Sequence, residues 1–163
     1  MSKNELEKIL DNTLAKSYKD KVQQVEDYFV SIADGKDVVG NGSELVYPDM
    51  WEYKHSFANG IYIREMRMKQ GQLGFSAIHK HSYGFFLLSG ILASSKEEGV
   101  EEFIAPCYII SPQGSKRIVY AIEDCVITTV HANPTNTEDL KQIEAANVVF
   151  SWKEYDKYLK SKK

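Results

Sequence analysis

The sequence lacks a long hydrophobic run, because no apolar stretch approaches the roughly 20 residues that a membrane-spanning helix needs. Its first ten residues, MSKNELEKIL, have no apolar centre of the kind found in secretion signals. We therefore expect a cytoplasmic protein with no membrane partner. Basic residues are not in excess either: 20 Lys and Arg stand against 23 Asp and Glu, giving a net charge of −3. This balance argues against charge-driven binding of nucleic acids.

Cysteine is scarce, and the two that occur, Cys107 and Cys125, do not form a C-x-x-C pair. A zinc site built from cysteines is therefore not expected, and both thiols are predicted to be free in a reducing compartment. The sequence also has no phosphate-binding Walker loop, no dinucleotide-binding glycine fingerprint and no serine–histidine–acid set. These absences exclude the commonest nucleotide-binding and hydrolytic classes.

Residues 1–34 carry the pattern of a long amphipathic helix that starts at a Ser2–Glu5 capping box and ends at Asp34-Gly35. Apolar residues recur there at steps of three and four: Leu6, Ile9, Leu10, Leu14, Tyr18, Val22, Val25, Phe29 and Ile32. The spacing from Leu10 onward is close to a heptad repeat, which favours self-association, most simply as a homodimer. The alternative is a helix that packs on its own domain.

Three further segments follow. Residues 35–53 are rich in Gly, Asn, Ser and Asp and are predicted to form a linker. Residues 54–134 show short apolar runs separated by turn residues, which is typical of a small barrel. The predicted strands are 54–57, 61–68, 73–80, 84–93, 101–105, 107–111, 117–121 and 124–131. Residues 135–163 are predicted to form two short helices, begun by capping boxes at Thr135–Glu138 and Ser151–Glu154.

The strongest candidates for a functional site are His79 and His81, which stand two residues apart at the end of a strand-like run. Side chains at i and i+2 of a strand point to the same face, so both imidazoles are predicted to face one cavity. His131 ends another predicted strand and is placed at the same cavity, the alternative being a strand cap. Glu65 shares a face with Ile61 and is predicted to point inward, unless it is an exposed edge charge.

Motifs within 54–131 resemble those of the cupin superfamily. Its first motif combines H-x-H with a later glutamate and glycine; His79, His81 and Gly90 match, but Tyr83 stands at the glutamate position. Its second motif, P-x-G-x-x-H, reads PQGSKR here, so that Arg117 replaces the histidine. The resemblance implies a mainly β fold, a cupin-type double-stranded β-barrel or jelly roll, here with a long N-terminal helix and short C-terminal helices.

The chain more closely resembles a group of small cupin-fold proteins of tailed bacteriophages. The matching stretches are KHSFANGIYIRE, IHKH, APCYIISPQGSKRIVYAIEDCVITTVHANPT and DLKQIE. This resemblance implies a viral origin and a location in the cytoplasm of an infected bacterium, with the virion as a second location. It implies no activity.

Two kinds of ligand fit the candidate residues. Three histidines with a carboxylate, His79, His81, His131 and Glu65, would suit a divalent transition metal such as Fe, Mn, Ni or Zn. A small polar ligand would instead meet Tyr83, Arg64, Arg117 and Tyr120. Arg117 and Lys116 suit an anion such as a carboxylate or phosphate, or ion pairs with Glu123 and Asp124. Without a metal, the resemblance to sugar epimerases of the cupin type implies an acid–base role for His79 and His81.

Three functions remain open from the sequence. The first is a cupin that binds a metal or small polar ligand, with or without enzymatic turnover. The second is a module of counter-defence type that captures a small ligand without changing it. The third is a virion-associated structural protein that keeps the fold. The tyrosine and the arginine at the two motif positions favour the second and third over a metal-dependent oxygenase.

Overall fold

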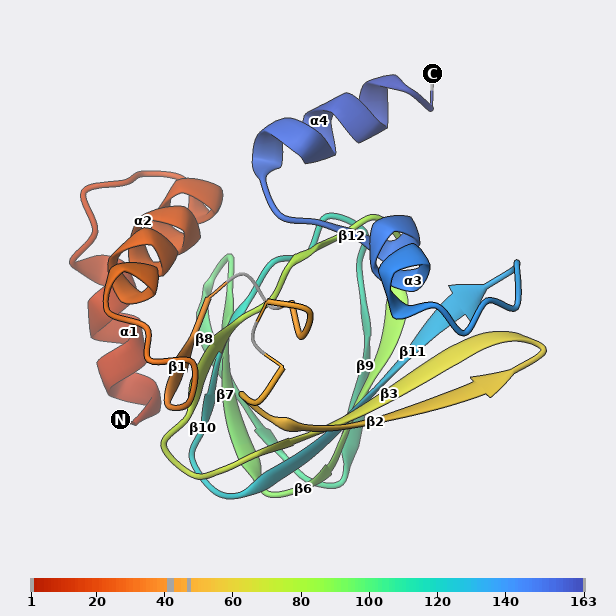
Figure 1. The fold of residues 1–163 in the computed structure, drawn as a ribbon. Coiled ribbons are helices and arrows are strands. Elements are labelled where there is room, and N and C mark those ends of the chain that lie inside the picture. Colours follow the sequence, from red (N-terminus) through yellow and green to blue (C-terminus); the bar gives the residue numbers. More distant parts are fainter. Residues whose placement is uncertain (1, 41–42, 47, 163) are drawn as a thin grey trace.

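The computed structural model describes residues 2–40, 43–46 and 48–162 and is built mainly from β-strands, with helices at both ends (Figure 1). Residues 1, 41, 42, 47 and 163, which belong to the predicted segments 1–34, 35–53 and 135–163, lie outside the described residues. No described helix is long and apolar enough to cross a membrane.

Two five-stranded sheets form the body of the protein (Figure 1). The first contains, in order, β1 (Val38–Val39), β4 (Leu73–Phe75), β10 (Ile118–Ala121), β7 (Ile91–Lys96) and β8 (Gly99–Ile104). The second contains β2 (Glu52–Ala58), β3 (Gly60–Met68), β11 (Cys125–Asn133), β6 (Tyr83–Ser89) and β9 (Cys107–Ser111). A short third sheet pairs β12 (Val148–Val149) with β5 (Ile78–His79).

The strand order identifies a jelly roll. Eight strands divide into the sets β3-β11-β6-β9 and β4-β10-β7-β8, so the chain repeatedly crosses from one sheet to the other. This is the arrangement of two interlocked Greek keys, and it buries one face of each sheet against the other. Residues of both sheets share one core, including Met66, Leu87, Leu92 and Val119. The mainly β fold class and the jelly-roll barrel predicted from the sequence are thus confirmed.

The predicted strand 84–93 is divided at Gly90, where the backbone turns from β6 into β7 with φ of +86°. A Cβ atom at Gly90 would lie 2.2 Å from the carbonyl oxygen of Asp124. Gly71 has a similar φ of +90°, but nothing lies within 4 Å of the place where its Cβ would be. A comparison of substitutions at the two glycines therefore distinguishes the effect of backbone strain from the effect of steric overlap.

We expect Gly90→Ala to destabilise the fold by more than Gly71→Ala. Both changes place alanine in a left-handed conformation, at about 1–2 kcal/mol each, and only Gly90→Ala adds an overlap with backbone. Urea unfolding of the two variants measures the difference. Equal losses of stability would show that the Gly90 turn moves freely away from Asp124.

The single long N-terminal helix predicted from the sequence is wrong, because two helices occur, α1 (Lys3–Asp11) and α2 (Tyr18–Ser31). Asn12 caps the end of α1, and the hydroxyl of Thr13 donates to the carbonyl of Leu10. Ser17 then caps the start of α2. The periodic Leu14 lies in the connection, with 92% of its surface exposed. Short polar side chains that bond to nearby backbone thus end the helix although the apolar spacing continues.

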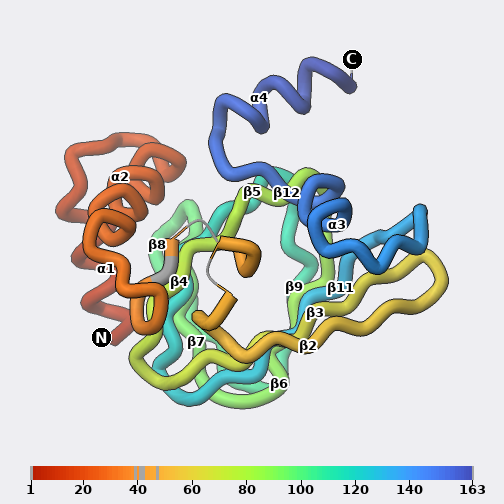
Figure 2. Tube along the Cα trace, viewed as in Figure 1, coloured from red at the N-terminus to blue at the C-terminus, as the bar shows by residue number. Residues whose placement is uncertain are grey.

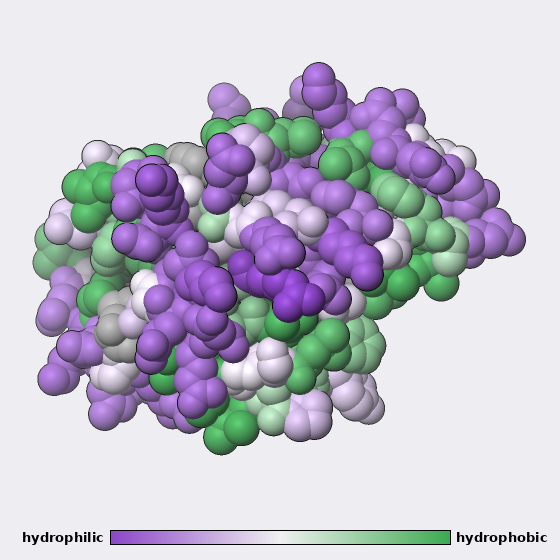
Figure 3. Space-filling view, turned by 60° about the horizontal axis from the view of Figure 1, so that its bottom comes forward, coloured by the Kyte–Doolittle hydropathy of each residue, from purple (hydrophilic) through white to green (hydrophobic). Residues whose placement is uncertain are grey.

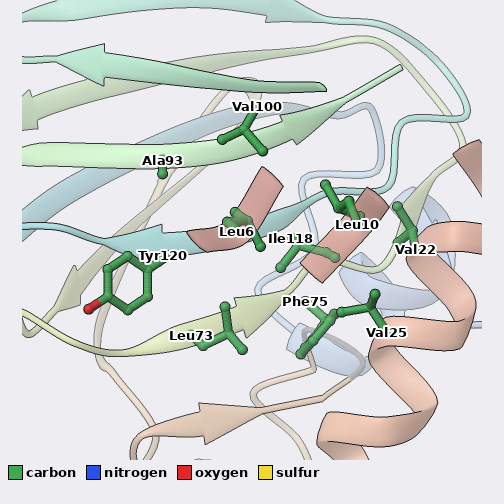
Figure 4. Close-up of a cluster of buried hydrophobic side chains, with 10 residues drawn as sticks. All are labelled: Leu6, Leu10, Val22, Val25, Leu73, Phe75, Ala93, Val100, Ile118 and Tyr120. Atoms are coloured by element: carbon green, nitrogen blue, oxygen red, sulfur yellow. The ribbon is translucent and has the colours of Figure 1, made fainter. Parts of the chain in front are cut away.

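The two helices cover the outer face of the first sheet. Leu6 and Leu10 of α1 and Val22 and Val25 of α2 point toward side chains of β4, β7, β8 and β10 (Figure 4). The apolar stripe that suggested a homodimer is therefore buried against its own domain, which was the alternative interpretation. Homodimerisation itself stays a prediction.

At the other end of the chain, α3 (Leu140–Asn147) lies over one end of the barrel and α4 (Trp152–Lys160) extends beyond it (Figures 1 and 2). The capping box of Ser151 and Glu154 is present at α4, as predicted. The Thr135–Glu138 box is not, since Asp139 caps α3 through the N–H groups of Lys141 and Gln142. An aspartate next to the helix competes successfully with the earlier threonine.

Candidate functional site

A cavity of about 90 Å³ lies inside the barrel. Its walls come from β3, β6 and β11 of the second sheet and from β4 and β10 of the first. Residues 44, 45 and 51, between β1 and β2, contribute from one side, and α3 covers the cavity from another.

The floor of the cavity follows from strand alternation and register. On β3 the inward residues are Tyr62, Arg64 and Met66, and β11 places a partner directly opposite each of them. Across β3, β11 and the following strand, the inward rows are Tyr62–His131, then Arg64–Thr129–Phe85, then Met66–Ile127–Leu87. The rows that contain polar residues lie nearest α3, and the apolar row lies deeper. The hydrogen-bonding side chains of these three strands are therefore concentrated at the end of the cavity nearest α3.

Two of the predicted histidines meet in this cavity. The ring centroids of His79 and His131 are 5.7 Å apart and their planes are nearly parallel. The phenol ring of Tyr83 stacks on both, at 3.9 Å from His79 and 5.0 Å from His131. Tyr83 thus lines the cavity beside the two histidines, and its role in ligand binding stays a prediction.

Both imidazoles are held neutral by their surroundings. Burial, together with the smaller effect of the positive charge of Arg64, lowers the pKa of His131 to about 3. Burial also lowers the pKa of His79 well below its usual value, with His131, Arg64 and Arg117 acting in the same direction. At neutral pH these rings are therefore uncharged hydrogen-bonding groups. The positive charges at the cavity are then those of Arg64 and Arg117.

Arg64 is partly balanced by Glu44. One oxygen of Glu44 lies 3.9 Å from the Arg64 guanidinium, and the other lies 3.0 Å from Nε2 of His55. Burial raises the pKa of Glu44, while Arg64 and His55 oppose that rise. The second carboxylate of the cavity, Glu144, accepts a hydrogen bond from the Ser43 hydroxyl at 2.7 Å. Both acids are thus engaged by the protein itself.

Arg117 is different because no carboxylate lies within ion-pair distance of it in the part of the chain that the structure describes. Its side chain lines the cavity, and one terminal nitrogen lies 3.5 Å from the Ser95 carbonyl. The neighbouring Lys116 points the opposite way and pairs with Glu26 of α2. The predicted ion pairs of Arg117 and Lys116 with Glu123 and Asp124 do not form, since Asp124 pairs with Lys69.

Several buried polar atoms around the cavity have no hydrogen-bond partner among residues 2–40, 43–46 and 48–162. Three are N–H donors, on Arg64 Nε, Arg117 Nε and Trp51 Nε1. Two more, His79 Nδ1 and Thr129 Oγ1, can donate or accept, and one, Glu44 Oε2, is an acceptor. A buried donor left unpaired costs about 1–3 kcal/mol. The cavity is therefore suited to a ligand rich in hydrogen-bond acceptors.

Three predicted site residues lie elsewhere. His81 is exposed and its ring meets Tyr158 of α4, because β5 ends at His79 and the chain bends before His81. Glu65 faces away from the cavity and pairs with Arg67 at 3.0 Å. Tyr120 points outward into the core beneath α1 and α2. The prediction that His79, His81 and His131 share one cavity is thus wrong for His81, and the inward orientation of Glu65 is wrong.

The metal centre predicted from the sequence is not assembled by the described residues. Neutral imidazoles are the form that binds metal ions, so His79 and His131 are competent ligands. However, no group of three or more His, Cys, Asp and Glu side chains in the described ranges is placed to hold an ion. A typical site needs three or four such ligands. The donor set fits an acceptor-rich organic ligand better than a metal.

Sequence reasoning missed part of the site. Glu44 and Trp51 lie in the predicted linker, where no periodic pattern marks an inward residue. Tyr62 lines the cavity and His55 bonds to it, and no sequence motif marks either residue. Both faces of β3 carry large residues, so alternation alone allowed either face to be the inward one. The inward row is Tyr62, Arg64, Met66 and Met68. On the other face, Ile61 is 40% exposed.

Comparison with protein-family models and with curated proteins found no match. Among solved structures, the chain is similar to a cupin-2 domain protein from Shewanella frigidimarina, with 14% identity and a TM-score of 0.44 over 51% of this chain and 81% of that one. An RmlC-like cupin from Methanocaldococcus jannaschii matches with 10% identity and a TM-score of 0.45 over 52% and 83%. A cupin 2 conserved barrel domain protein from Salinispora arenicola matches with 12% identity and a TM-score of 0.45 over 59% and 87%.

Proposed function

We propose that the barrel cavity binds a small organic anion, whose carboxylate lies between the guanidinium groups of Arg64 and Arg117. The observation that carries the proposal is Arg117, a cavity-lining cation without a carboxylate partner among the described residues. A guanidinium and a carboxylate form strong, directional hydrogen bonds, particularly where water is largely excluded.

The remaining walls favour a ligand with a short apolar body. Met66, Phe85, Val119 and Ile127 line the cavity beyond the two arginines. A volume of about 90 Å³ is smaller than the engineered cavity of about 150 Å³ that holds benzene. A short-chain carboxylate therefore matches both the charge and the size, whereas a nucleotide or a sugar phosphate would have to extend through the opening.

Butyrate is the probe for this proposal, and butyramide is its neutral counterpart of the same shape. We expect butyrate to bind and to raise the melting temperature of the protein, and butyramide to do neither to a comparable extent. Removal of a charge-assisted hydrogen bond costs about 1.5–3 kcal/mol, so Arg117→Gln is expected to weaken butyrate binding by about tenfold to hundredfold. Isothermal titration calorimetry measures the affinities.

Arg67→Gln is the matched control, because Arg67 lies on the opposite face of β3 and pairs with Glu52 and Glu65. It removes the same charge without touching the cavity, so butyrate affinity should be unchanged. Wild-type protein that binds butyramide as tightly as butyrate would overturn the proposal. So would an Arg117→Gln variant that is folded by circular dichroism and keeps the wild-type affinity for butyrate.

A further inference from the structure

Three side chains form a hydrogen-bonded chain that ends at the cavity. Oε1 of Glu44 lies 3.0 Å from Nε2 of His55. The other ring nitrogen of His55, Nδ1, lies 2.8 Å from the hydroxyl oxygen of Tyr62. Tyr62 is only 5% exposed and lines the cavity next to Arg64. Anion binding alone does not require a carboxylate and an imidazole behind a phenol.

The direction of the hydrogen bonds follows from the carboxylate. A carboxylate oxygen of Glu44 only accepts, so in the imidazole form of His55 the hydrogen is on Nε2 and is donated to Glu44. Nδ1 of His55 is then an acceptor, and the hydroxyl of Tyr62 donates to it. The free lone pairs of the Tyr62 oxygen are left for the cavity. In this order, carboxylate to imidazole to hydroxyl, the Tyr62 hydroxyl can accept a proton from another molecule while it passes its own proton to the His55 imidazole.

The packing around the chain keeps this order in place. The His55 ring stacks between Tyr53 and Tyr62, with centroid distances of 6.3 and 5.9 Å and planes within 13° of parallel. His55 and Tyr62 lie on neighbouring strands, β2 and β3. Burial raises the pKa of Tyr62 above its usual value, so its hydroxyl stays protonated at neutral pH. Tyr62 therefore serves as a proton carrier and does not act as a phenolate.

We propose that Tyr62, His55 and Glu44 form a proton relay that reversibly removes a proton from a carbon atom next to a carbonyl group of the bound anion. A carboxylate that also carries such a carbonyl group is an oxo acid, and 2-oxo acids, which include the smallest of these, match a cavity of about 90 Å³, so this class of molecule is assigned as the substrate. The proposal rests on the anion site of Arg64 and Arg117. Tyr62 is the catalytic residue; His55 and Glu44 act through it as positioning residues.

The proton and the electrons balance without a further reactant. The C–H bond of the 2-oxo acid breaks as its proton forms a bond to the Tyr62 oxygen. The original hydroxyl proton of Tyr62 moves to Nδ1 of His55, and Glu44 stabilises the resulting imidazolium. The electron pair of the C–H bond forms the enolate, whose negative charge on the former carbonyl oxygen lies next to the arginines. The reverse sequence returns a proton to the same carbon.

Other buried groups of the cavity are less suited to this role. The ring of His79 has an Nδ1 atom without a partner in the described part of the chain, and no carboxylate is bonded to it. His131 is held neutral by burial and by Arg64, which opposes its accepting a proton. Only Tyr62 among the described cavity residues combines a hydroxyl in the cavity with an imidazole and a carboxylate behind it.

The test is the exchange of the C3 protons of 2-oxobutyrate for deuterium in D₂O, followed by proton NMR. General base catalysis contributes about a hundredfold to ten-thousandfold, so wild-type protein should accelerate exchange at least about a hundredfold over buffer. Tyr62→Phe removes only the hydroxyl and should return exchange to the buffer rate. Tyr108→Phe makes the same change at an exposed tyrosine of β9 outside the cavity and should leave exchange at the wild-type rate.

The role of His55 has a separate readout. His55→Ala should lose exchange, and added imidazole should restore part of it by occupying the vacated space. Imidazole should not restore exchange in Tyr62→Phe, because the group that contacts the substrate is then absent. A merely structural role of His55 would give no rescue by imidazole. Glu44→Asp should retain more activity than Glu44→Gln, since only aspartate keeps the charge that holds the imidazolium.

Saturation-transfer NMR on the same samples reports whether 2-oxobutyrate binds. Binding without accelerated exchange would overturn the relay and leave the anion site standing. Absence of binding would overturn both the relay and the proposed function for this class of ligand. Exchange by Tyr62→Phe at the wild-type rate would overturn the assignment of Tyr62.

Discussion

Replacing Glu26 with glutamine is expected to cost about 3–5 kcal/mol of folding free energy, one of the two largest single effects expected in this chain. Glu26 of α2 pairs with Lys116, just before β10, and both side chains are almost fully buried, at 4% and 0% exposure. Glutamine would leave the Lys116 ammonium buried without a negative partner. The same region carries a hydrogen bond from the Tyr18 hydroxyl to the Lys116 carbonyl at 3.0 Å, so α2 and the sheet are tied at this point.

Urea unfolding of Glu26→Gln measures this cost. Asp27→Asn is the matched control, because Asp27 is the next residue of α2 and is exposed, so it should change stability by less than about 0.5 kcal/mol. The double variant Glu26→Leu with Lys116→Met removes both charges and should recover most of the loss. If Glu26→Gln unfolds at the same urea concentration as Asp27→Asn, the buried pair does not hold α2 to the sheet.

Acidification from pH 6.5 to 4.5 is expected to destabilise the protein through His79 and His131. Both have a folded-state pKa far below the unfolded value of about 6.5, about 3 in the case of His131. Between these values the unfolded chain binds a proton that the folded chain does not, so stability is present above pH 6.5 and is lost as the pH falls. Each histidine contributes up to about 1.4 kcal/mol per pH unit, hence roughly 5 kcal/mol for the pair over this range.

The slope of unfolding free energy against pH isolates the histidine contribution from any uniform loss of stability. His131→Gln should reduce the slope by about one proton, and His79→Gln should do the same. His81→Gln is the control, since that ring is exposed, and it should leave the slope unchanged. A slope that stays at the wild-type value in both His131→Gln and His79→Gln would show that these rings are not held neutral.

Much of the barrel could be predicted because its turns and apolar runs are local signals. Gly60, Gly71 and Gly114 adopt positive φ between predicted strands, whereas Gly90 does so within the predicted strand 84–93. The helix break at residues 12–17 could not be predicted from apolar spacing, since Leu14 keeps the period while it lies exposed. The polar caps at Asn12 and Ser17 were the signal for that break, and the longer hydrophobic pattern concealed it.

The candidate site was only half predictable for a different reason. Alternation requires a continuous strand, and β5 ends at His79, so the i and i+2 argument fails for His81. The pairing of His131 with Tyr62 and of Thr129 with Arg64 depends on register between strands that are far apart in sequence. No single-strand pattern contains that information. Glu44 reaches the cavity from a loop and could be found only from the folded chain.

The bacteriophage origin, the cytoplasmic or virion location and the homodimer stay predictions. Exposed apolar side chains do gather on parts of the surface, where hydrophobic patches interrupt the hydrophilic residues (Figure 3). The most exposed large ones in the described chain, apart from Leu14, include Ile104, Tyr108 and Ile110. Analytical ultracentrifugation at micromolar concentration decides between a monomer and a dimer.

The most direct test of the central claim is a crystal structure of the protein grown with butyrate. We expect butyrate inside the barrel, with its carboxylate oxygens within hydrogen-bonding distance of the guanidinium groups of Arg64 and Arg117 and its alkyl chain against Phe85 and Ile127. A cavity that holds no butyrate, or one in which a metal ion bound by His79 and His131 occupies the site, would contradict it.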